Sequence, residues 1–562
     1  MVRVNTKRKQ SKQALSAVQL FLLGLFAILL AGSSAFSQTA TPAADSGGPG
    51  TENNQDQSSS SPSASDTDAQ IMQELDRMRN RIQELESQLK QRHTSTTAAA
   101  DATNAAAGTQ EHFVSESVSS SKASEQTEAP AESTPAKAEP FAFADWTWLN
   151  GNPRTKEPAF DSKFFTPEVR ADVAYHYDFN HPKDDTISGS SEVFRSNEVS
   201  LTHLGIGGDF HYDHVRARVF TQLGLYSTAT PRNDASYSRG QWQLDNAYRY
   251  LNEAYGGYHF DALHGINVDA GIFLSYVGLF SFYQFDNWAY QPSYVSSNTP
   301  WFFTGMRIQI FPTEKLKIEP WIINDWQSYA RPNGRLGFGG QILWRPTPWL
   351  SIISNNYGAG ADAIGIPNRT RYHTDNSVEV KYYDHPERFL DKMAFSLTGD
   401  AGCETGGGVN CTTNKKDPAG TIVAYKQSFL GFMLYNRWWF YKDRYAFTLG
   451  GGKINNPGRY LVLLPPINGA TATTGTPYFT ENPGDPFKAW DMSATYDYMP
   501  SQYITFRWEF NHRHANVPYW SGPGGVTPPG GNNGNPAAII SGWFPDLRKT
   551  EDRATMAILV KF

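Results

Sequence analysis

Apolar and polar side chains alternate, residue by residue, along one short segment after another from about residue 165 onward. In the closing segment, Met556 and Ile558 share a face with Phe562, whereas Arg553 and Lys561 lie on the opposite face. Alternation with a period of two residues is typical of a β-strand that separates two different environments. Similar runs occupy residues 169–179, 215–225, 302–310, 378–382, 490–498 and 504–511. Most of these runs are close in length to a tilted strand that crosses a bilayer, which needs about 9–11 residues.

The links between these segments alternate between short and long. Tight links are expected at residues 213–214, 261–263, 312–314, 345–348, 385–390, 442–443 and 500–501. Longer links, rich in Gly, Pro and Asn, are expected near residues 180–196, 227–247, 275–301, 327–334, 359–372, 402–419, 454–486 and 512–548. Short turns on one rim and long loops on the other are typical of a bacterial outer-membrane barrel, and the links predict about 16 strands.

The pattern therefore predicts an all-β fold, a transmembrane antiparallel β-barrel in residues 141–562. Aromatic residues make up 14% of the chain while its mean hydropathy is only −0.51, which suits aromatic girdles around a polar interior. A water-soluble β-sandwich also alternates, but it buries one face in a packed core and usually has fewer strands. We favour the barrel because charged residues oppose the aromatic ones throughout residues 165–562.

Both ends of the chain carry features typical of export to the bacterial outer membrane. Residues 1–37 combine a cationic start, a short apolar stretch and small residues at Ala35 and Ser37, which predicts a signal peptide cleaved after Ser37. The apolar stretch is shorter than the about 20 residues that a membrane-spanning helix needs. Phe562 gives the last alternating segment an aromatic end, and we expect it to be a signal for the outer-membrane barrel-assembly machinery.

Two segments before the barrel, residues 38–67 and 93–140, have a low-complexity polar composition and are expected to be disordered linkers. Residues 68–92 between them have heptad spacing, which predicts a short coiled-coil helix. Its seam comprises Ile71, Leu75, Met78, Ile82, Leu85 and Leu89. Because so short a helix is marginal alone, we expect a homo-oligomer, with a trimer formed through the barrel and the coiled coil. The mixed seam does not distinguish dimer from trimer, and an amphipathic helix that never assembles is the alternative.

Cys403 and Cys411 lie eight positions apart in a link rich in Gly and Thr. In an exported chain they are expected to form a disulfide, which we favour over zinc binding because no matching Cys or His pair lies nearby. His512 and His514 could share one strand face, but a pair without a third ligand is weak evidence for a metal. We predict no metal, no cofactor and, at a net charge of −6, no nucleic-acid partner.

A barrel of this strand number is too wide for its own side chains to fill, so a water-filled channel for small hydrophilic solutes is expected. No compact plug domain is visible before the barrel. Charged residues of both signs are predicted to face the lumen as ordinary solvated side chains, which predicts no extreme ion selectivity. They are Arg170, Asp172, Arg216, Arg218, Arg307, Glu379, Asp491, Asp497, Arg507 and Glu509.

The link at residues 275–301 is unusually aromatic and carries one acidic residue and no basic one. A loop of this composition is not expected to lie free in water. We hypothesise that it folds into the channel as a constriction, and packing against the rim or a neighbouring subunit is the equal alternative. The residues assigned to the constriction are Phe280, Phe282, Tyr283, Asp286, Asn287, Trp288 and Tyr290.

Several short motifs resemble one family, the OmpL-like β-barrel porins. They are Leu251–Tyr255, Asp269–Phe273, Val277–Gly278, Asp286–Tyr290, Phe303–Arg307 and Gly339–Trp344 before Pro346–Thr347. The clearest resemblance covers residues 245–360, and it extends over most of residues 160–562. It implies an outer-membrane porin and brings no catalytic residue to this chain.

Two other functions remain open at this point. A barrel that tethers the membrane to the cell wall or to partners is compatible with the linkers and the helix. An outer-membrane hydrolase is the second, but the sequence has no Gly-x-Ser-x-Gly motif and no compact cluster of His, Ser and Asn. No catalytic residue is therefore assigned, and the chain is expected not to be an enzyme.

Overall fold

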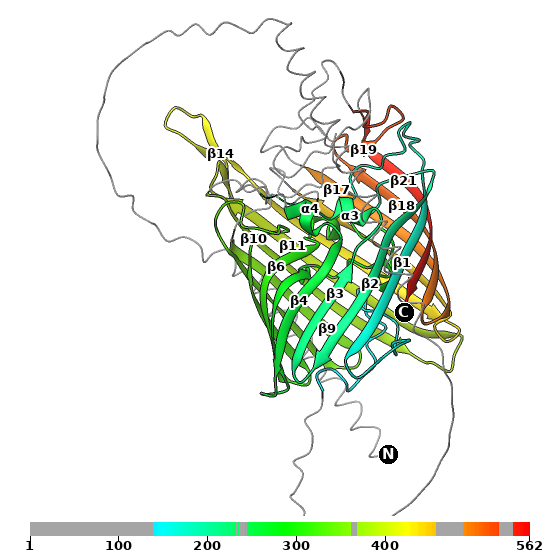
Figure 1. Cartoon of the computed structure of the whole chain (residues 1–562). Coiled ribbons are helices and arrows are strands. Elements are labelled where there is room, and N and C mark those ends of the chain that lie inside the picture. Colours follow the sequence, from blue (N-terminus) through cyan, green and yellow to red (C-terminus); the bar gives the residue numbers. More distant parts are fainter. Residues whose placement is uncertain are drawn as a thin grey trace, which may run out of the picture. The chain divides into compact units, whose positions relative to one another are not determined.

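A computed structural model describes residues 139–190, 192–231, 234, 242, 244–360, 368–456, 487–527, 543 and 545–562. The predicted signal peptide and coiled coil, and the predicted linkers as far as residue 138, lie outside the described residues. Sixteen antiparallel strands form one closed barrel (Figure 1). They are β1 (Phe165–Asp178), β2 (Val199–Tyr212), β3 (Val215–Thr221), β4 (Leu251–Phe260), β5 (Ile266–Leu274), β6 (Phe302–Thr313), β7 (Leu316–Ile323), β8 (Gly337–Thr347), β9 (Leu350–Gly360), β10 (Thr370–Asp384), β11 (Leu390–Thr405), β15 (Ser428–Phe440), β16 (Tyr445–Asn455), β17 (Lys488–Ser501), β18 (Ile504–Ala515) and β21 (Thr550–Lys561).

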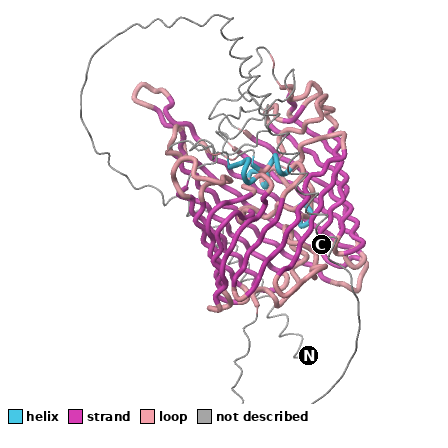
Figure 2. Tube along the Cα trace, in the orientation of Figure 1, coloured by secondary structure: helices cyan, strands magenta, loops and turns pink. Residues whose placement is uncertain are grey.

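Little other regular structure accompanies the barrel in the described residues (Figure 2). The remaining elements are the helices α3 (Tyr226–Ala229) and α4 (Leu244–Tyr248), the 3₁₀ turns η3 (Gln284–Asp286) and η4 (Ser296–Asn298), and the short strands β12 (Val409–Asn410), β13 (Lys415–Lys416), β14 (Ile422–Lys426), β19 (Trp520–Ser521) and β20 (Leu547–Arg548). None of the helices in this part of the chain is long and apolar enough to span a membrane.

The prediction of about sixteen strands with alternating links is confirmed. Links of a few residues, such as 213–214 between β2 and β3 or 502–503 between β17 and β18, gather at the lower rim in Figure 1. The long links lie at the opposite rim. The barrel closes between β1 and β21, where Arg170 faces Lys561 and Tyr175 faces Met556 across the ladder. Closure leaves no unpaired sheet edge, which is what a bilayer requires of a β-structure.

Alternation of burial along the strands separates an inner from an outer face. On β21, Arg553 is fully buried inside the barrel, whereas Met556 and Ile558 are 57% and 45% exposed on the outside. On β2 the alternation changes face midway, because the β1–β2 register shifts and both Thr202 and His203 are buried. That shift is a β-bulge, which adds one residue to a strand and re-aims those that follow.

β15 carries large apolar side chains on both faces, and the structure explains those on the inner face. Phe429, Met433, Tyr435 and Trp439 point inward and are each at most 5% exposed. Met433, Tyr435 and Trp439 belong to the largest hydrophobic cluster, which also contains residues of the link 275–301 and of the segment before β1. The inner face of β15 is therefore covered by protein rather than by water.

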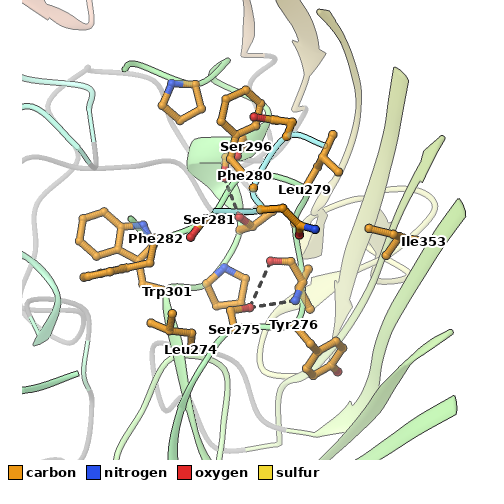
Figure 3. A pocket seen from close by; sticks show the side chains of 18 of the residues that line it. Leu274, Ser275, Tyr276, Leu279, Phe280, Ser281, Phe282, Ser296, Trp301 and Ile353 are labelled. Atoms are coloured by element: carbon orange, nitrogen blue, oxygen red, sulfur yellow. Dashed lines mark hydrogen bonds between the residues drawn. The ribbon is translucent and has the colours of Figure 1, made fainter. Parts of the chain in front are cut away.

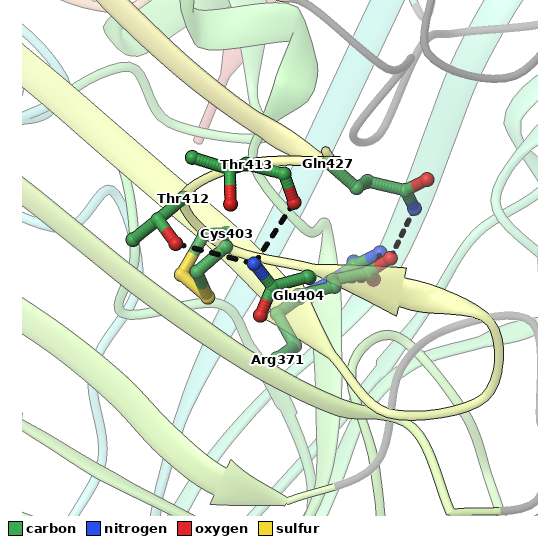
Figure 4. The surroundings of a disulfide bond; sticks show 8 residues. Arg371, Cys403, Glu404, Thr412, Thr413 and Gln427 are labelled. Atoms are coloured by element: carbon green, nitrogen blue, oxygen red, sulfur yellow. Dashed lines mark hydrogen bonds and ion pairs between the residues drawn. A yellow bond between two sulfur atoms is a disulfide. The ribbon is translucent and has the colours of Figure 1, made fainter. Parts of the chain in front are cut away.

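The predicted pairing of Cys403 and Cys411 is present as a disulfide in the structure (Figure 4). It joins the end of β11 to the residue after β12, in the long link that carries β12, β13 and β14. Beside it, Glu404 accepts hydrogen bonds from Arg371 and Gln427. The bond thus ties the base of a projecting loop to the end of β11.

Candidate functional site

The link between β5 and β6, residues 275–301, enters the barrel; we call it the inner loop. Carboxylates of the inner wall hold its backbone. Glu509 of β18 accepts hydrogen bonds from the N–H groups of Tyr290 and Gln291, at 2.6 and 2.8 Å. Asp491 of β17 accepts from the Tyr294 N–H at 2.7 Å. Hydrogen bonds to charged acceptors in a dry environment are among the stronger ones in proteins.

Side chains of the inner loop are held in the same way. The Tyr290 hydroxyl donates to Asp172 of β1 at 3.0 Å, and Ser293 Oγ donates to Asp491 at 2.9 Å. Asp286 receives a hydrogen bond from Arg170 Nη1 of β1 at 3.0 Å. These contacts dock the loop at β1, β17 and β18. On other strands, Tyr283 donates to Glu253 of β4 and Tyr276 donates to the Asn356 carbonyl of β9.

Two wall arginines bind carbonyl oxygens of the inner loop. Arg507 of β18 donates to the carbonyls of Gln284 and Asn287, at 3.1 and 2.6 Å, and Arg437 of β15 donates to that of Trp288 at 3.2 Å. Asp497 lies between them and accepts from both guanidinium groups, at 2.7 and 2.8 Å. The arginines thus bridge a buried carboxylate and the peptide groups of the loop.

The ten residues that sequence reasoning assigned to the lumen all lie on barrel strands. Eight of them are buried: Arg170, Asp172, Arg218, Glu379, Asp491, Asp497, Arg507 and Glu509. The expectation of ordinary solvated side chains is wrong for these eight, because the inner loop, neighbouring charges or the segment before β1 cover them. Arg216 and Arg307 are partly exposed, and each pairs with Asp269, at 3.2 and 3.0 Å.

The residues assigned to the constriction are placed within the inner loop as follows. Tyr283, Asp286, Asn287, Trp288 and Tyr290 are buried, whereas Phe280 and Phe282 are half-buried. The Phe280 ring packs on Tyr435 and the Trp288 ring on Trp439, with ring centres 5.0 and 5.6 Å apart. The loop therefore packs against β15 inside the barrel, not against its rim.

A second segment also lies inside the barrel, and sequence reasoning missed it. Residues 141–154, here called the N-terminal segment, contribute Trp146 and Trp148 to the same hydrophobic cluster, at 8% and 1% exposure. Asn150 Oδ1 accepts from the Trp288 N–H at 2.8 Å. A signal was present, since the run Phe141–Trp148 is strongly aromatic directly after a polar, low-complexity linker.

Burial changes the pKa values of two side chains in the inner loop. Burial raises the pKa of Asp286 above its ordinary value of 3.8, although the Arg170 guanidinium acts in the opposite direction. Burial also raises the pKa of Tyr290 well above its ordinary value. Both side chains therefore favour the neutral form more than they would in water.

A cavity of about 310 Å³ remains between the inner loop, the N-terminal segment and the wall of β7 to β10 (Figure 3). Its lining mixes polar groups with aromatic rings. Examples are Asn150, Ser275, Tyr276, Ser281, Trp301, Gln341, Arg345 and Glu379. In Figure 3, Ser275 and Ser281 lie in the middle of the lining, and Ile353 comes from the opposite wall.

No group of three or more His, Cys, Asp or Glu side chains among the described residues is arranged to hold a metal ion. His512 instead hydrogen-bonds to Asp552 at 2.7 Å, and His514 to Thr550 at 3.1 Å. The site thus consists of the inner loop and the N-terminal segment, packed against charged residues of the barrel wall, with a cavity beside them.

Several solved outer-membrane proteins match this chain at low identity. OmpT of Vibrio cholerae is 8% identical with a TM-score of 0.40, over 72% of this chain and 99% of OmpT. OprB of Pseudomonas putida is 11% identical with a TM-score of 0.40, over 71% of this chain and 94% of OprB. The outer-membrane channel DcaP of Acinetobacter baumannii is 12% identical with a TM-score of 0.39, over 72% of this chain and 100% of DcaP.

No curated protein matches the sequence of this chain. One family model, described as Putative beta-barrel porin-2, OmpL-like, matches residues 170–560, which is more than half of the chain and nearly the whole barrel. The chain therefore belongs to the OmpL-like family of β-barrel porins in the outer membrane.

Proposed function

We propose that this outer-membrane porin conducts small hydrophilic solutes by passive diffusion, along a path that the inner loop narrows. The observation that carries the proposal is the docking of the inner loop on wall residues such as Asp491 and Glu509. A barrel of sixteen strands is too wide to be filled by its own side chains. A loop that occupies part of the interior then sets the width that remains for solutes.

The cavity beside the inner loop supports a path along the wall of β7 to β10. The charged residues that line the cavity are balanced in sign: Lys317 and Arg345 are basic, and Glu192 and Glu379 are acidic. Balanced charge on the path favours small neutral or weakly charged solutes over strong selection for one ion. We therefore keep the expectation of weak ion selectivity.

Planar-bilayer recording with the purified full chain tests this function. We expect stepwise conductance, and in liposome-swelling assays a permeation rate that falls as the sugar becomes larger. Deleting residues 280–290 should raise the conductance, because the docked part of the inner loop is removed. Unchanged conductance would reject the constriction. Silent bilayers together with hydrolysis of lipid or peptide would instead favour an outer-membrane hydrolase.

Export and assembly are part of the same proposal. We propose that residues 1–37 direct export, that Phe562 is read by the barrel-assembly machinery, and that three chains assemble. The Phe562 backbone pairs with Val169 of β1 at 2.9 Å, so the last residue helps to close the barrel. Cross-linking in intact membranes tests the trimer, and Leu75→Asp with Ile82→Asp should lower the yield of cross-linked species if the heptad seam contributes.

A further inference from the structure

We propose that the N-terminal segment, residues 141–154, is a withdrawable plug that closes the short-turn end of the channel. This inference rests on the proposed channel function, and it adds a gate that is separate from the inner loop. The aromatic side chains of this segment bind the inner wall of the same chain.

Both ends of the N-terminal segment are attached at the rim of short turns. The Phe141 N–H donates to the carbonyl of Glu314, in the turn between β6 and β7, at 2.7 Å. At the other end, Arg154 donates to the carbonyl of Ser501 at 2.7 Å, beside the turn between β17 and β18. Because the segment enters and leaves at one rim, it can leave the barrel as a hairpin without threading through it.

The tip of this hairpin is Asn150 and Gly151, inside the barrel and in contact with the inner loop. The Asn150 N–H donates to Glu379 of β10 at 2.8 Å, and the Gly151 N–H donates to the Asp286 carbonyl at 3.1 Å. Gly151 has a φ of +75°, and a Cβ there would lie 2.3 Å from the Leu279 carbonyl oxygen. Only glycine fits so close an approach, so the tip is shaped to meet the inner loop.

Cations of the inner wall and its lower turns face the aromatic rings of the segment. The guanidinium carbon of Arg345 lies 5.1 and 4.9 Å from the ring centres of Phe141 and Trp146. Lys381 Nζ lies 5.7 Å from the Trp148 ring. Cation–π attraction therefore adds to the burial of Trp146 and Trp148 in holding the segment against the wall.

The plug also couples the two rims of the barrel. Its Asn150 side chain accepts the Trp288 N–H, so withdrawal leaves a buried donor of the inner loop without its partner. A buried donor without a partner is unfavourable, so this loss weakens the docking of the loop. Withdrawal of the plug therefore opens the lower rim and loosens the constriction together.

Single-channel recording on full-length variants tests the plug. We expect the double variant Trp146→Ala/Trp148→Ala to conduct at least about twofold more than the natural chain, because the bulkiest plug side chains are removed. Trp349→Ala is the matched control: Trp349 lies in the turn between β8 and β9, is 42% exposed, and should leave conductance unchanged. Heat-dependent gel mobility verifies that each barrel is folded.

A reversible lock provides the second measurement. Trp148→Cys and Lys381→Cys replace two side chains that face each other. Joined through disulfides by a short bifunctional thiol reagent, they should tie the segment to the wall, so that conductance is low when oxidised and rises on reduction. The natural chain under the same reductant controls for the Cys403–Cys411 bond. Equal conductance of all variants, oxidised or reduced, would overturn the plug and leave the porin intact. Silence of every variant, including the Trp double variant, would overturn both.

Discussion

Arg170 on β1 and Asp286 in the inner loop form a buried ion pair, with 3.0 Å between Nη1 and Oδ1. The guanidinium also lies over the Tyr283 ring, 3.9 Å from its centre. The pair ties the inner loop to the first strand of the barrel, next to the seam where β1 meets β21. Its carboxyl is less acidic than usual, because burial raises the pKa of Asp286 despite the arginine.

This raised pKa predicts that the inner loop docks more firmly at acidic pH. For an acid whose pKa is raised on docking, the stabilisation is fully present below the ordinary pKa and is lost as pH rises through the raised value. Conductance of the natural chain should therefore fall as pH is lowered from neutral toward 4. Single-channel recording across this pH range tests whether conductance falls or rises on acidification. Asp286→Asn should flatten the profile, and a profile that is identical in the two proteins would assign the pH response elsewhere.

Asp491 is predicted to determine how well the second half of the inner loop is held. Asp491→Ala removes the acceptor of the Tyr294 N–H and of Ser293 Oγ, which leaves two donors unsatisfied at about 1–3 kcal/mol each. We expect Asp491→Ala to show more frequent conductance fluctuations than the natural chain. Asp491→Asn should show a frequency between the two. Asp552→Ala on β21 is the control, since Asp552 bonds to His512 and not to the loop. A quiet, unchanged Asp491→Ala channel would contradict this role.

Arg507 is predicted to be the most costly wall charge to remove. Arg507→Met leaves Asp497 with one cationic partner and frees two loop carbonyls in a buried setting. Breaking a buried pair of this kind typically costs about 3–5 kcal/mol. The temperature at which the barrel loses its compact gel mobility should fall accordingly. Arg548→Met, which breaks an exposed pair with Asp546, should change it little.

The barrel could be predicted from sequence because its signals are local. Period-two alternation and turn composition each act over a few residues, and the sixteen strands follow from them. What covers the inner face depends on residues far apart in the chain. Trp439 on β15 has an apolar setting because Trp288 packs on it, with ring centres 5.6 Å apart. No local sequence pattern predicts that the inner loop, rather than water, contacts the inner face of β15.

Dependence on residues far apart in the chain also explains why two features of the interior are not predicted from sequence: the burial of the wall charges and the position of the N-terminal segment. Arg507 and Asp497 have the alternation of lumen residues, and alternation reveals the face of a strand but not what fills the space beyond it. The N-terminal segment lacks a strand or helix pattern, so its aromatic run was not recognised as part of the interior. Its bonds, such as that between Asn150 and Glu379, join residues 229 positions apart.

The disulfide is predicted to stabilise the projecting loop without supporting the barrel. Cys403 lies at the end of β11, and Cys411 belongs to the link that carries β12 to β14, outside the closed sheet. Cys403→Ser/Cys411→Ser should therefore leave the thermal stability of the barrel nearly unchanged, while limited proteolysis within residues 406–427 becomes faster. Reduction of the natural chain should have the same effect on cleavage. A large fall in barrel stability would show instead that the loop supports the ladder between β10 and β11, where Arg371 and Glu404 meet at 2.8 Å.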